Sequence, residues 1–430
     1  MSRLLGIIVL PMAIVALAAL PAACVPDSPT ITGGNEAADM QSAGGGDMSN
    51  FAGSPSGGSA GQSNGGTADI GTEDGGAGAG GVSGGANVPG FPLPCAVLSD
   101  GGSPCVAAHS TVRVIVPGYA GPLYQLCKGP AAPGPSSCKG TVQDIGSKDG
   151  YVDFATHATF CAGGACTITK IYDQSGQHND LEPAPPGGAK GTPDMPADAG
   201  ALQVTLDGHS AYGILIEPGV GYRTGCSGCN IKSGRGMATG DEPESMYWVT
   251  SQKDLVDVCC FDYGNAETSS NNDGNGTMEA LYFGAGVSWG TGFGGKPGPW
   301  GMADLENGLF AGWENQQNKN ISSNGPLKYN FVTSVLLGDS KEKNGGKGRF
   351  ALYGGNAAEG ALKTMYDGIR PTPNYVPMQK KGSIILGIGG DNSDGSGGRF
   401  YEGAISAGPV VSKQTADMLQ AAIVAVKYGQ

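Results

Sequence analysis

The sequence predicts an all-β fold in which two sheets pack as a sandwich of jelly-roll type. Many short runs are rich in β-branched and aromatic residues and end at Gly, Pro, Asn or Asp, which is typical of strands joined by turns. Residues 328–337 and 349–354 alternate apolar and polar side chains with the period of two that a half-buried strand requires. The last stretch, Lys413 to Tyr428, instead places Ala, Leu, Met and Val at helical spacing. These patterns favour a β-sandwich with one C-terminal helix.

The N-terminus predicts export. Arg3 precedes an apolar run from Leu4 to Leu20, and small residues follow it, so residues 1–24 are expected to be a signal peptide rather than a membrane span. The segment from Leu20 to Cys24 is similar to a lipobox, which predicts lipidation of Cys24. The alternative is ordinary cleavage near Ala23. The protein is therefore expected to be lipid-anchored at the cell surface or outer membrane, or otherwise secreted.

Residues 25–92 are predicted to be a flexible linker. They are rich in Gly and Ser and nearly free of aromatic residues, so they cannot bury a core. A coil of this length would span about 45 Å on average. The remaining residues, 93–430, are expected to form one globular domain.

Ten runs in this domain are predicted to be strands, and no internal repeat accompanies them, which argues against a propeller or solenoid. They are 110–117, 166–174, 201–208, 211–216, 245–251, 279–284, 327–338, 348–355, 382–390 and 399–407.

The cysteine count predicts disulfides. The chain has 11 cysteines, and ten remain once Cys24 is set aside; an even set in an exported protein indicates disulfide pairing. Taken in sequence order, these ten cysteines form five short-range pairs. Alternatively, Cys259 and Cys260 could equally pair with Cys226 and Cys229. A four-cysteine metal site would need two C-x-x-C segments, and only Cys226 to Cys229 has that spacing.

Charge and motifs exclude several functions. The formal net charge is −13 and no Lys/Arg cluster occurs, which argues against nucleic acid as a partner. The four histidines lack zinc-site spacing, and no phosphate-binding loop with its Lys is present. His109 has no marked serine partner and is expected to be structural. Neither a metal nor an organic cofactor is expected.

Two acidic segments are candidates for catalysis. If 302–306 is a strand, Asp304 and Glu306 share one face, and their mutual repulsion would separate their pKa values as carboxylate catalysis requires. The alternative is a solvated strand face. Asp391 follows an apolar strand at 383–388, where a loop can carry function. Here the alternatives are an Asx turn or a calcium-binding loop.

Two such carboxyl groups are what a glycosidase needs, together with an aromatic surface for the sugar ring. The candidates for that surface are Trp248, Trp289, Trp300 and Trp313.

A set of longer motifs carries a family resemblance. They include SPCVAAHSTVRVIV, FCAGGACTITKIYDQSGQHNDLEPAPPGG, GVGYR, ATGDEPESMYWV, CCFDYGNAETSS, MEALYFG, GPWGMADLENGLFAG and GSIILGIGGDNSDGSGGRFYEG. Together they resemble the catalytic domain of α-L-arabinofuranosidase B, glycoside hydrolase family 54, from about Pro94 to Tyr428.

The resemblance implies a concanavalin-like jelly-roll sandwich that releases terminal, non-reducing α-L-arabinofuranosyl groups with retention. It places the nucleophile on Glu306 and the acid/base on Asp391. The further positions that it implies around the sugar are Asp304, Asn307, Leu309, Gly390, the stacking Trp289 and a vicinal disulfide between Cys259 and Cys260.

The same resemblance implies disulfides Cys95–Cys105 and Cys161–Cys166. The pairs Cys127–Cys138 and Cys226–Cys229 look like additions to the family pattern, and 341–347 differs in detail. The family's usual C-terminal arabinose-binding module is not expected, since the sequence stops at Gln430, and surface tethering is expected to replace it.

The predicted partner is plant cell-wall polysaccharide, arabinoxylan or arabinan, with membrane contact only through the lipid on Cys24 and a monomeric state. Two other functions are weighed against the enzyme: a non-catalytic carbohydrate-binding lectin and a calcium-stabilised scaffold.

Overall fold

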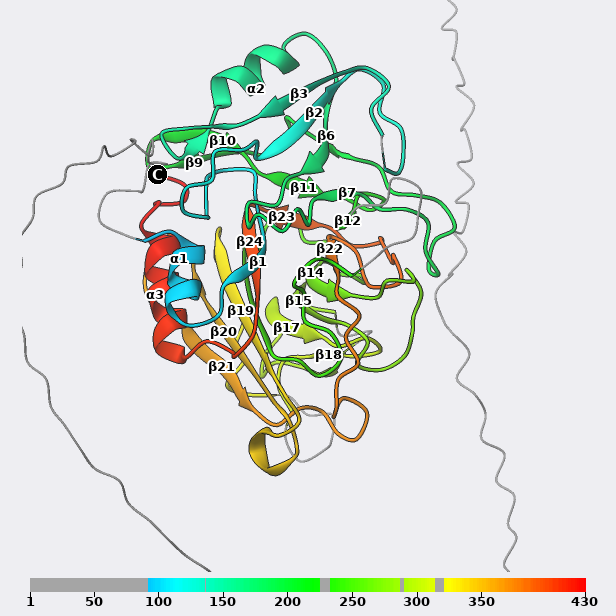
Figure 1. Ribbon diagram of the computed structural model, residues 1–430, viewed down its shortest axis with the longest axis vertical. Coiled ribbons are helices and arrows are strands. Elements are labelled where there is room, and N and C mark those ends of the chain that lie inside the picture. The colour runs from blue at the N-terminus through cyan, green and yellow to red at the C-terminus, as the bar shows by residue number, and fades with distance from the viewer. Residues whose placement is uncertain (1–91, 136, 225–232, 287–289, 314–320) are drawn as a thin grey trace, which may run out of the picture. The chain divides into compact units, whose positions relative to one another are not determined.

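The computed structural model describes residues 92–135, 137–224, 233–286, 290–313 and 321–430, and two large sheets dominate it (Figure 1). The first sheet is antiparallel throughout. Its order is β1 (Cys105–Ser110), β24 (Glu402–Ala407), β13 (Glu244–Thr250), β19 (Val332–Asp339), β20 (Arg349–Asn356) and β21 (Lys363–Gly368).

The second sheet is longer and carries the candidate site at one end. Its order is β16 (Gly290–Gly292), β18 (Leu309–Phe310), β17 (Trp300–Asp304), β15 (Glu279–Gly284), β14 (Asp262–Ala266), β22 (Ser383–Leu386), β12 (Tyr222–Thr224), β7 (Leu181–Pro183), β6 (Cys166–Ile171), β2 (Tyr124–Lys128) and β3 (Thr141–Ile145), and β8 (Ala197–Asp198) also pairs with β6. Three two-stranded ribbons complete the strands: β9 (Gln203–Leu206) with β10 (His209–Tyr212), β11 (Ile214–Ile216) with β23 (Gly398–Phe400), and β4 (Ser147–Lys148) with β5 (Tyr151–Val152).

The core lies between the two sheets, so the predicted sandwich is confirmed. Strands β15 and β17 of the second sheet lie against β19 and β20 of the first. Alternation along β15 sends Leu281 and Phe283 into this core. From the first sheet, Trp248 is fully buried and meets the ring of Phe261 at a centroid distance of 4.9 Å. Trp248 is therefore a core residue and not a sugar platform.

The predicted C-terminal helix is confirmed as α3 (Lys413–Val424), although it ends before Tyr428. It begins where the hydroxyl of Ser412 accepts a hydrogen bond from the N–H of Thr415 at 3.1 Å, which is a typical N-cap. Helix α1 (Pro94–Asp100) lies beside α3 (Figure 1). Helices α1 and α2 (Phe154–Cys161) were not predicted, because seven or eight residues are too few to show helical periodicity. A 3-10 turn spans Lys343–Gly345.

The predicted strand 110–117 is wrong, because the actual strand β1 stops at Ser110. The Ser110 hydroxyl accepts hydrogen bonds from the N–H groups of Val112 at 3.2 Å and Arg113 at 3.1 Å. This local turn ends the strand although the residues after it are β-branched. Within the described ranges, no helix has the length and apolar character that a membrane span requires.

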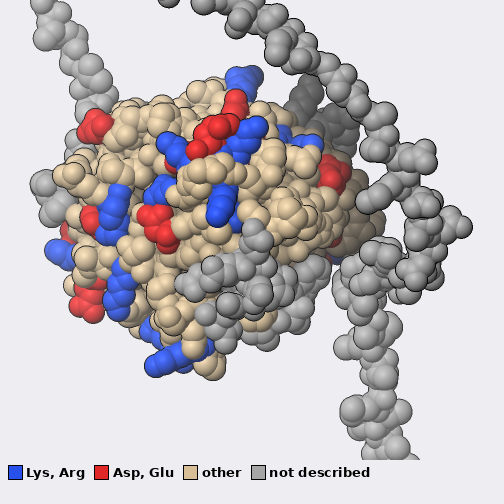
Figure 2. Space-filling model, turned by 90° about the horizontal axis from the view of Figure 1, so that it is seen from below, with Lys and Arg blue, Asp and Glu red and all other residues tan. Residues whose placement is uncertain are grey.

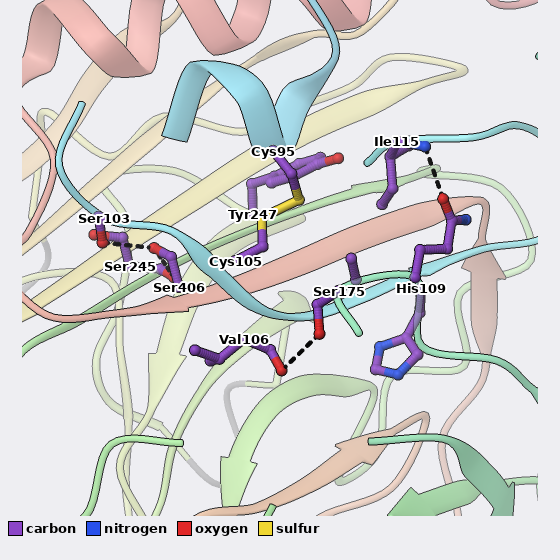
Figure 3. The surroundings of a disulfide bond; sticks show 12 residues. Cys95, Ser103, Cys105, Val106, His109, Ile115, Ser175, Ser245, Tyr247 and Ser406 are labelled. Atoms are coloured by element: carbon purple, nitrogen blue, oxygen red, sulfur yellow. Dashed lines mark hydrogen bonds between the residues drawn. A yellow bond between two sulfur atoms is a disulfide. The ribbon is translucent and has the colours of Figure 1, made fainter. Parts of the chain in front are cut away.

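Within the described residues, four disulfides join Cys95–Cys105, Cys127–Cys138, Cys161–Cys166 and Cys259–Cys260. Figure 3 shows the first of them, which ties α1 to β1. The same view shows His109, whose ring nitrogens lie 3.0 Å from the hydroxyl of Tyr263 and 2.9 Å from the carbonyl of Asn179. With both nitrogens engaged, His109 is structural, as the sequence indicated.

Several predictions fall outside the described residues. They are the Cys226–Cys229 disulfide, the position of Trp289, the signal segment 1–24 with Cys24, and the linker 25–92 except for its last residue.

Two groups of charged side chains inside the sandwich form ion pairs. Arg113 binds Glu402 through two hydrogen bonds of 2.6 Å, and both side chains are almost fully buried. Between the sheets, Lys380 lies 2.9 Å from Glu279 and 3.2 Å from Glu244. On the surface, Figure 2 shows one face on which basic and acidic side chains are interspersed. The described side chains drawn on that face form no contiguous basic patch.

Candidate active site

Glu306 sits in a tight turn between two strands. Strand β17 ends at Asp304, β18 begins at Leu309, and the N–H of Leu305 bonds the carbonyl of Gly308 at 3.2 Å. Glu306 and Asn307 between them both have φ of 59°. Two central residues at positive φ are typical of a type I′ hairpin turn, and left-handed backbone at residues other than Gly is strained. The expectation that 302–306 is one strand is therefore wrong, because the chain reverses at Glu306.

The site lies on the face of the second sheet that points away from the core. Asp304 pairs across to Ala280, and Ala280 pairs to Gly264, so one row of this face combines a carboxyl with two small residues. A Cβ on Gly264 would stand 2.5 Å from the Cα of Ala280. This close approach keeps the floor of the site flat. Asp262, two residues before Gly264, lies on the same face and is fully buried.

The vicinal disulfide borders this floor. Both sulfurs of Cys259 and Cys260 and a carboxylate oxygen of Asp304 lie within 4.8 Å of one another. The disulfide belongs to a small apolar cluster with Tyr282, Trp300, Met302, Leu309 and Ala311, separate from the main core. Because the two sulfurs are bonded to each other, they offer an apolar surface and not thiolates.

Asp391 reaches the same place from the loop after β22. Its Oδ1 accepts the N–H of Ser393 at 3.0 Å, so the Asx turn considered from the sequence is present. The hydroxyl of Ser393 in turn lies 3.5 Å from the sulfur of Cys259. The loop that carries Asp391 therefore rests against the vicinal disulfide.

Gly390 brings this loop to the carboxyl groups. A Cβ on Gly390 would stand 1.9 Å from Oε2 of Glu267 and 3.1 Å from Oε2 of Glu306. Only glycine leaves both carboxyl groups where they are. The structure thus gathers Asp304, Glu306, Gly390 and the residue next to it, Asp391, at one end of the second sheet.

Glu267 was not predicted, yet it lies in the middle of this group. It directly follows β14, is fully buried, and its Oε1 accepts the hydroxyl of Thr277 at 2.6 Å. Its other oxygen has no donor among the described side chains and faces Glu306. The sequence offered a signal, because Asp262 and Glu267 stand in the same CCFDYGNAETSS stretch as the cysteines. Which carboxyl group they meet depends on strand pairing, which the stretch alone does not reveal.

Crowding of acids raises their pKa values. Burial, and then the charges of Glu267, Asp304 and Asp391, raise the pKa of Glu306. Burial also raises the pKa of Glu267, whose carboxyl faces that of Glu306 across Gly390. Two carboxyl groups in such contact hold one proton between them and titrate as a pair.

A second pair of acids repeats this pattern on the same two strands, β14 and β17. Burial raises the pKa of Asp304 above its usual range. Burial and the Asp304 charge raise the pKa of Asp262 well above its usual range. Asp262 is therefore the protonated member, and it can donate a hydrogen bond to Asp304.

The remaining predicted residues lie in different surroundings. The Asn307 amide is exposed and donates to the side-chain oxygens of Asn272 at 3.1 Å and Asn275 at 3.0 Å. Leu309 is buried in the apolar cluster beside the disulfide. Trp300 lies in that same cluster, whereas Trp313 packs in the core against Phe310, with ring centroids 5.5 Å apart.

Two carboxyl groups beside an apolar surface can attack an anomeric carbon and protonate a leaving oxygen. A model of the family described as "Alpha-L-arabinofuranosidase B, catalytic" matches residues 94–429. The chain is 48% identical over 342 residues to a probable alpha-L-arabinofuranosidase B of Aspergillus fumigatus and to the alpha-L-arabinofuranosidase B of Emericella nidulans. Each match covers 78% of this chain and 62% of the relative, so the chain spans less than two thirds of these proteins.

Solved structures agree with this match. A crystal structure of an arabinofuranosidase complexed with arabinofuranosyl-alpha-1,2-xylobiose is 43% identical with a TM-score of 0.70, over 78% of this chain and 66% of that chain. A GH54 α-L-arabinofuranosidase soaked with a cyclic sulfate inhibitor has a TM-score of 0.69 at the same identity and coverage.

Proposed function

Because the chain belongs to the α-L-arabinofuranosidase B catalytic family, glycoside hydrolase family 54, we propose that it is a retaining α-L-arabinofuranosidase. It removes terminal, non-reducing α-L-arabinofuranosyl groups from arabinoxylan, arabinan and related side chains. The observation that carries this proposal is the family match across 94–429 together with the gathering of Glu306 and Asp391 around Gly390.

In the first step Glu306 attacks the anomeric carbon of the arabinofuranosyl group. The bond from that carbon to the glycosidic oxygen breaks, and Asp391 gives its proton to the departing oxygen. The products are a glycosyl ester on Glu306 and a free alcohol. In the second step Asp391 takes a proton from water, the water oxygen attacks the anomeric carbon, and Glu306 leaves as a carboxylate.

Glu306 must be ionised to attack. Since it shares a proton with Glu267, the reactive arrangement has that proton on Glu267, which then donates a hydrogen bond to the Glu306 carboxylate. The turn also supports this geometry: the hydroxyl of Tyr375 donates to the carbonyls of Glu306 and Asn307, at 3.2 Å each.

The sugar ring lies on the vicinal disulfide. The Cys259 and Cys260 sulfurs form an apolar surface beside Asp304, and Asp304 is placed to bind a sugar hydroxyl. Asn307, Leu309 and Gly390 complete the pocket, and Trp289 stacks on the ring. Neither a metal nor an organic cofactor takes part.

Export is part of this proposal. Disulfides form and persist in oxidising compartments, and the part of the chain that the structure describes contains four of them. Residues 1–24 act as a lipoprotein-type signal segment, in which cleavage before Cys24 leaves that residue to carry the lipid. Residues 25–92 tether the catalytic domain, which works as a monomer. Mass analysis of the membrane fraction should find diacylglycerol on Cys24, whereas a mature form that begins elsewhere contradicts the anchor.

The test of the activity follows the first-formed sugar by proton NMR. The purified protein is given 4-nitrophenyl α-L-arabinofuranoside, with 4-nitrophenyl β-xylopyranoside as the control substrate. Retention predicts that the α-anomer of arabinose appears first and equilibrates later. Initial release of the β-anomer would contradict the retaining mechanism, and saturable binding without hydrolysis would identify the lectin alternative.

A further inference from the structure

Arg223 is a buried cation that the proposed mechanism does not use. It is the central residue of the short strand β12, and its side chain is 1% exposed. A buried guanidinium costs free energy unless its N–H groups find acceptors. The acceptors that it finds therefore indicate what it holds in place.

The guanidinium of Arg223 binds the loop of Asp391 at the residues before and after Asp391. Its Nη1 donates to the carbonyl of Gly390 at 2.7 Å and to Oδ1 of Asn392 at 2.7 Å. These two residues are the immediate neighbours of Asp391 in the chain. The backbone of Asp391 is thus held by one planar group.

The other N–H groups of Arg223 reach two more strands of the sheet. Nη2 donates to the backbone carbonyl of Glu267, and Nε donates to the hydroxyl of Ser383 at 3.2 Å. Glu267 follows β14 and Ser383 begins β22. One side chain therefore connects the loop of Asp391 to the strand whose end carries Glu267.

Charge reinforces this arrangement. Burial lowers the pKa of Arg223, and the carboxyl charges of Glu267, Asp391, Glu306 and Asp273, in that order of effect, oppose this shift. A nearby cation favours the ionised form of each carboxyl group. Arg223 therefore offsets part of the repulsion among the acids at this site.

We propose that Arg223 is a positioning residue of the reaction. Its fork, the planar set of guanidinium N–H donors, holds the backbone of Asp391 in the position from which the carboxyl delivers its proton, and its charge keeps Glu306 ionisable. This inference rests on the proposed arabinofuranosidase activity. A lysine in the same place would keep the charge but not the fork, because an ammonium has no planar pair of N–H groups. The two contributions are therefore separable by substitution.

Arg223→Lys tests the geometric part. Its kcat/KM for a poor leaving group, an arabinofuranosyl xylo-oligosaccharide, should fall about tenfold further than its kcat/KM for the 4-nitrophenyl glycoside, because only the former depends on protonation by Asp391. Asn392→Ala removes one acceptor of the fork and should shift the same ratio in the same direction by less. If Arg223→Lys does not fold, Asn392→Ala alone tests the geometric part of the proposal.

Arg223→Met tests the charge. Without the cation, the ionised form of Glu306 is less favoured, so the acidic limb of the kcat/KM profile against pH, which follows ionisation of the nucleophile, should move upward by about one pH unit. In Arg223→Lys this limb should stay near that of the wild type. A purely structural role would lower the melting temperature and the active fraction and would move neither this limb nor the leaving-group ratio.

Arg113→Lys is the matched control, since Arg113 is equally buried but binds Glu402 on the first sheet. It should lose stability while its leaving-group ratio and pH profile match the wild type. An unchanged ratio in both Arg223→Lys and Asn392→Ala, or an unmoved acidic limb in a folded Arg223→Met, would overturn this inference and leave the proposed function standing. A wild-type protein inactive on both substrates would overturn the proposed function and this inference with it.

Discussion

The backbone N–H of Glu306 donates a hydrogen bond of 3.0 Å to Oδ1 of Asp304, two residues before it. The bond closes the turn in which Glu306 and Asn307 take the left-handed backbone conformation. The carboxyl group of Asp304 thus holds the backbone that carries the carboxyl group of Glu306. Contacts around the turn balance its backbone strain. The proposed nucleophile is therefore set by its backbone as well as by its side chain.

Glu306→Gln should lower hydrolysis of the aryl glycoside by about 10⁴-fold or more, since an amide cannot form the glycosyl ester. The melting temperature should not fall, because the amide is uncharged and removes the repulsion with Glu267, Asp304 and Asp391. Stopped assays and thermal melts check both. Glu342→Gln, at an exposed glutamate, is the control. Retained activity would place the nucleophile elsewhere.

Asp391→Asn should slow substrates with poor leaving groups about 10²-fold or more beyond activated aryl glycosides, because only the former need a proton in the first step. Added azide should restore turnover of the aryl substrate by attacking the glycosyl-enzyme in place of activated water. The control is Asp394→Asn, on the same loop as Asp391; it loses an ion pair with Lys190 and should keep the wild-type leaving-group dependence. Equal losses on all substrates would argue against an acid role.

Cys259→Ala/Cys260→Ala should raise KM for the aryl glycoside more than it lowers kcat, because it removes the apolar surface beside Asp304. The loss of an apolar contact the size of a methylene group corresponds to about 1–3 kcal/mol, which is a 10- to 200-fold rise in KM. Cys161→Ala/Cys166→Ala removes a disulfide elsewhere and should lower stability without this change in KM. An unchanged KM in the first variant would mean that the vicinal disulfide only stabilises the loop and does not contact the sugar.

Asp262→Asn should stabilise the protein increasingly as pH rises from 5 to 8. Burial and the Asp304 charge raise the folded-state pKa of Asp262 well above its unfolded value. The folded state then binds more protons than the unfolded state, so the wild type loses stability as pH rises past the unfolded pKa of about 3.9. The amide has no such loss, and it can donate the same hydrogen bond to Asp304.

Melting temperatures of both proteins across this range measure the effect of Asp262→Asn. Asp417→Asn, at a half-exposed position on α3, is the control and should show little change with pH. A difference that stays constant from pH 5 to 8 would mean that Asp262 is ionised in the folded protein.

Local patterns in the sequence were sufficient for much of the architecture. The run EALYFG, bounded by a glycine, anticipated strand β15, and helical spacing anticipated α3. Strand 110–117 was misplaced, because a hydroxyl of Ser110 ends β1 through two hydrogen bonds that composition does not reveal. The hairpin at Glu306 was missed for a related reason, since Glu and Asn at positive φ carry no glycine signal.

The sequence by itself determined the all-β class, the C-terminal helix and the identity of the two candidate carboxyl residues, because periodicity and motif chemistry are properties of neighbouring residues. Only the tertiary structure decided that Glu267 pairs with Glu306, that Asp262 pairs with Asp304, and that Arg223 holds the loop of Asp391. These contacts join strands far apart in the chain. They depend on which strands pair and in what register, and burial then turns the resulting proximity into shared protons and shifted pKa values.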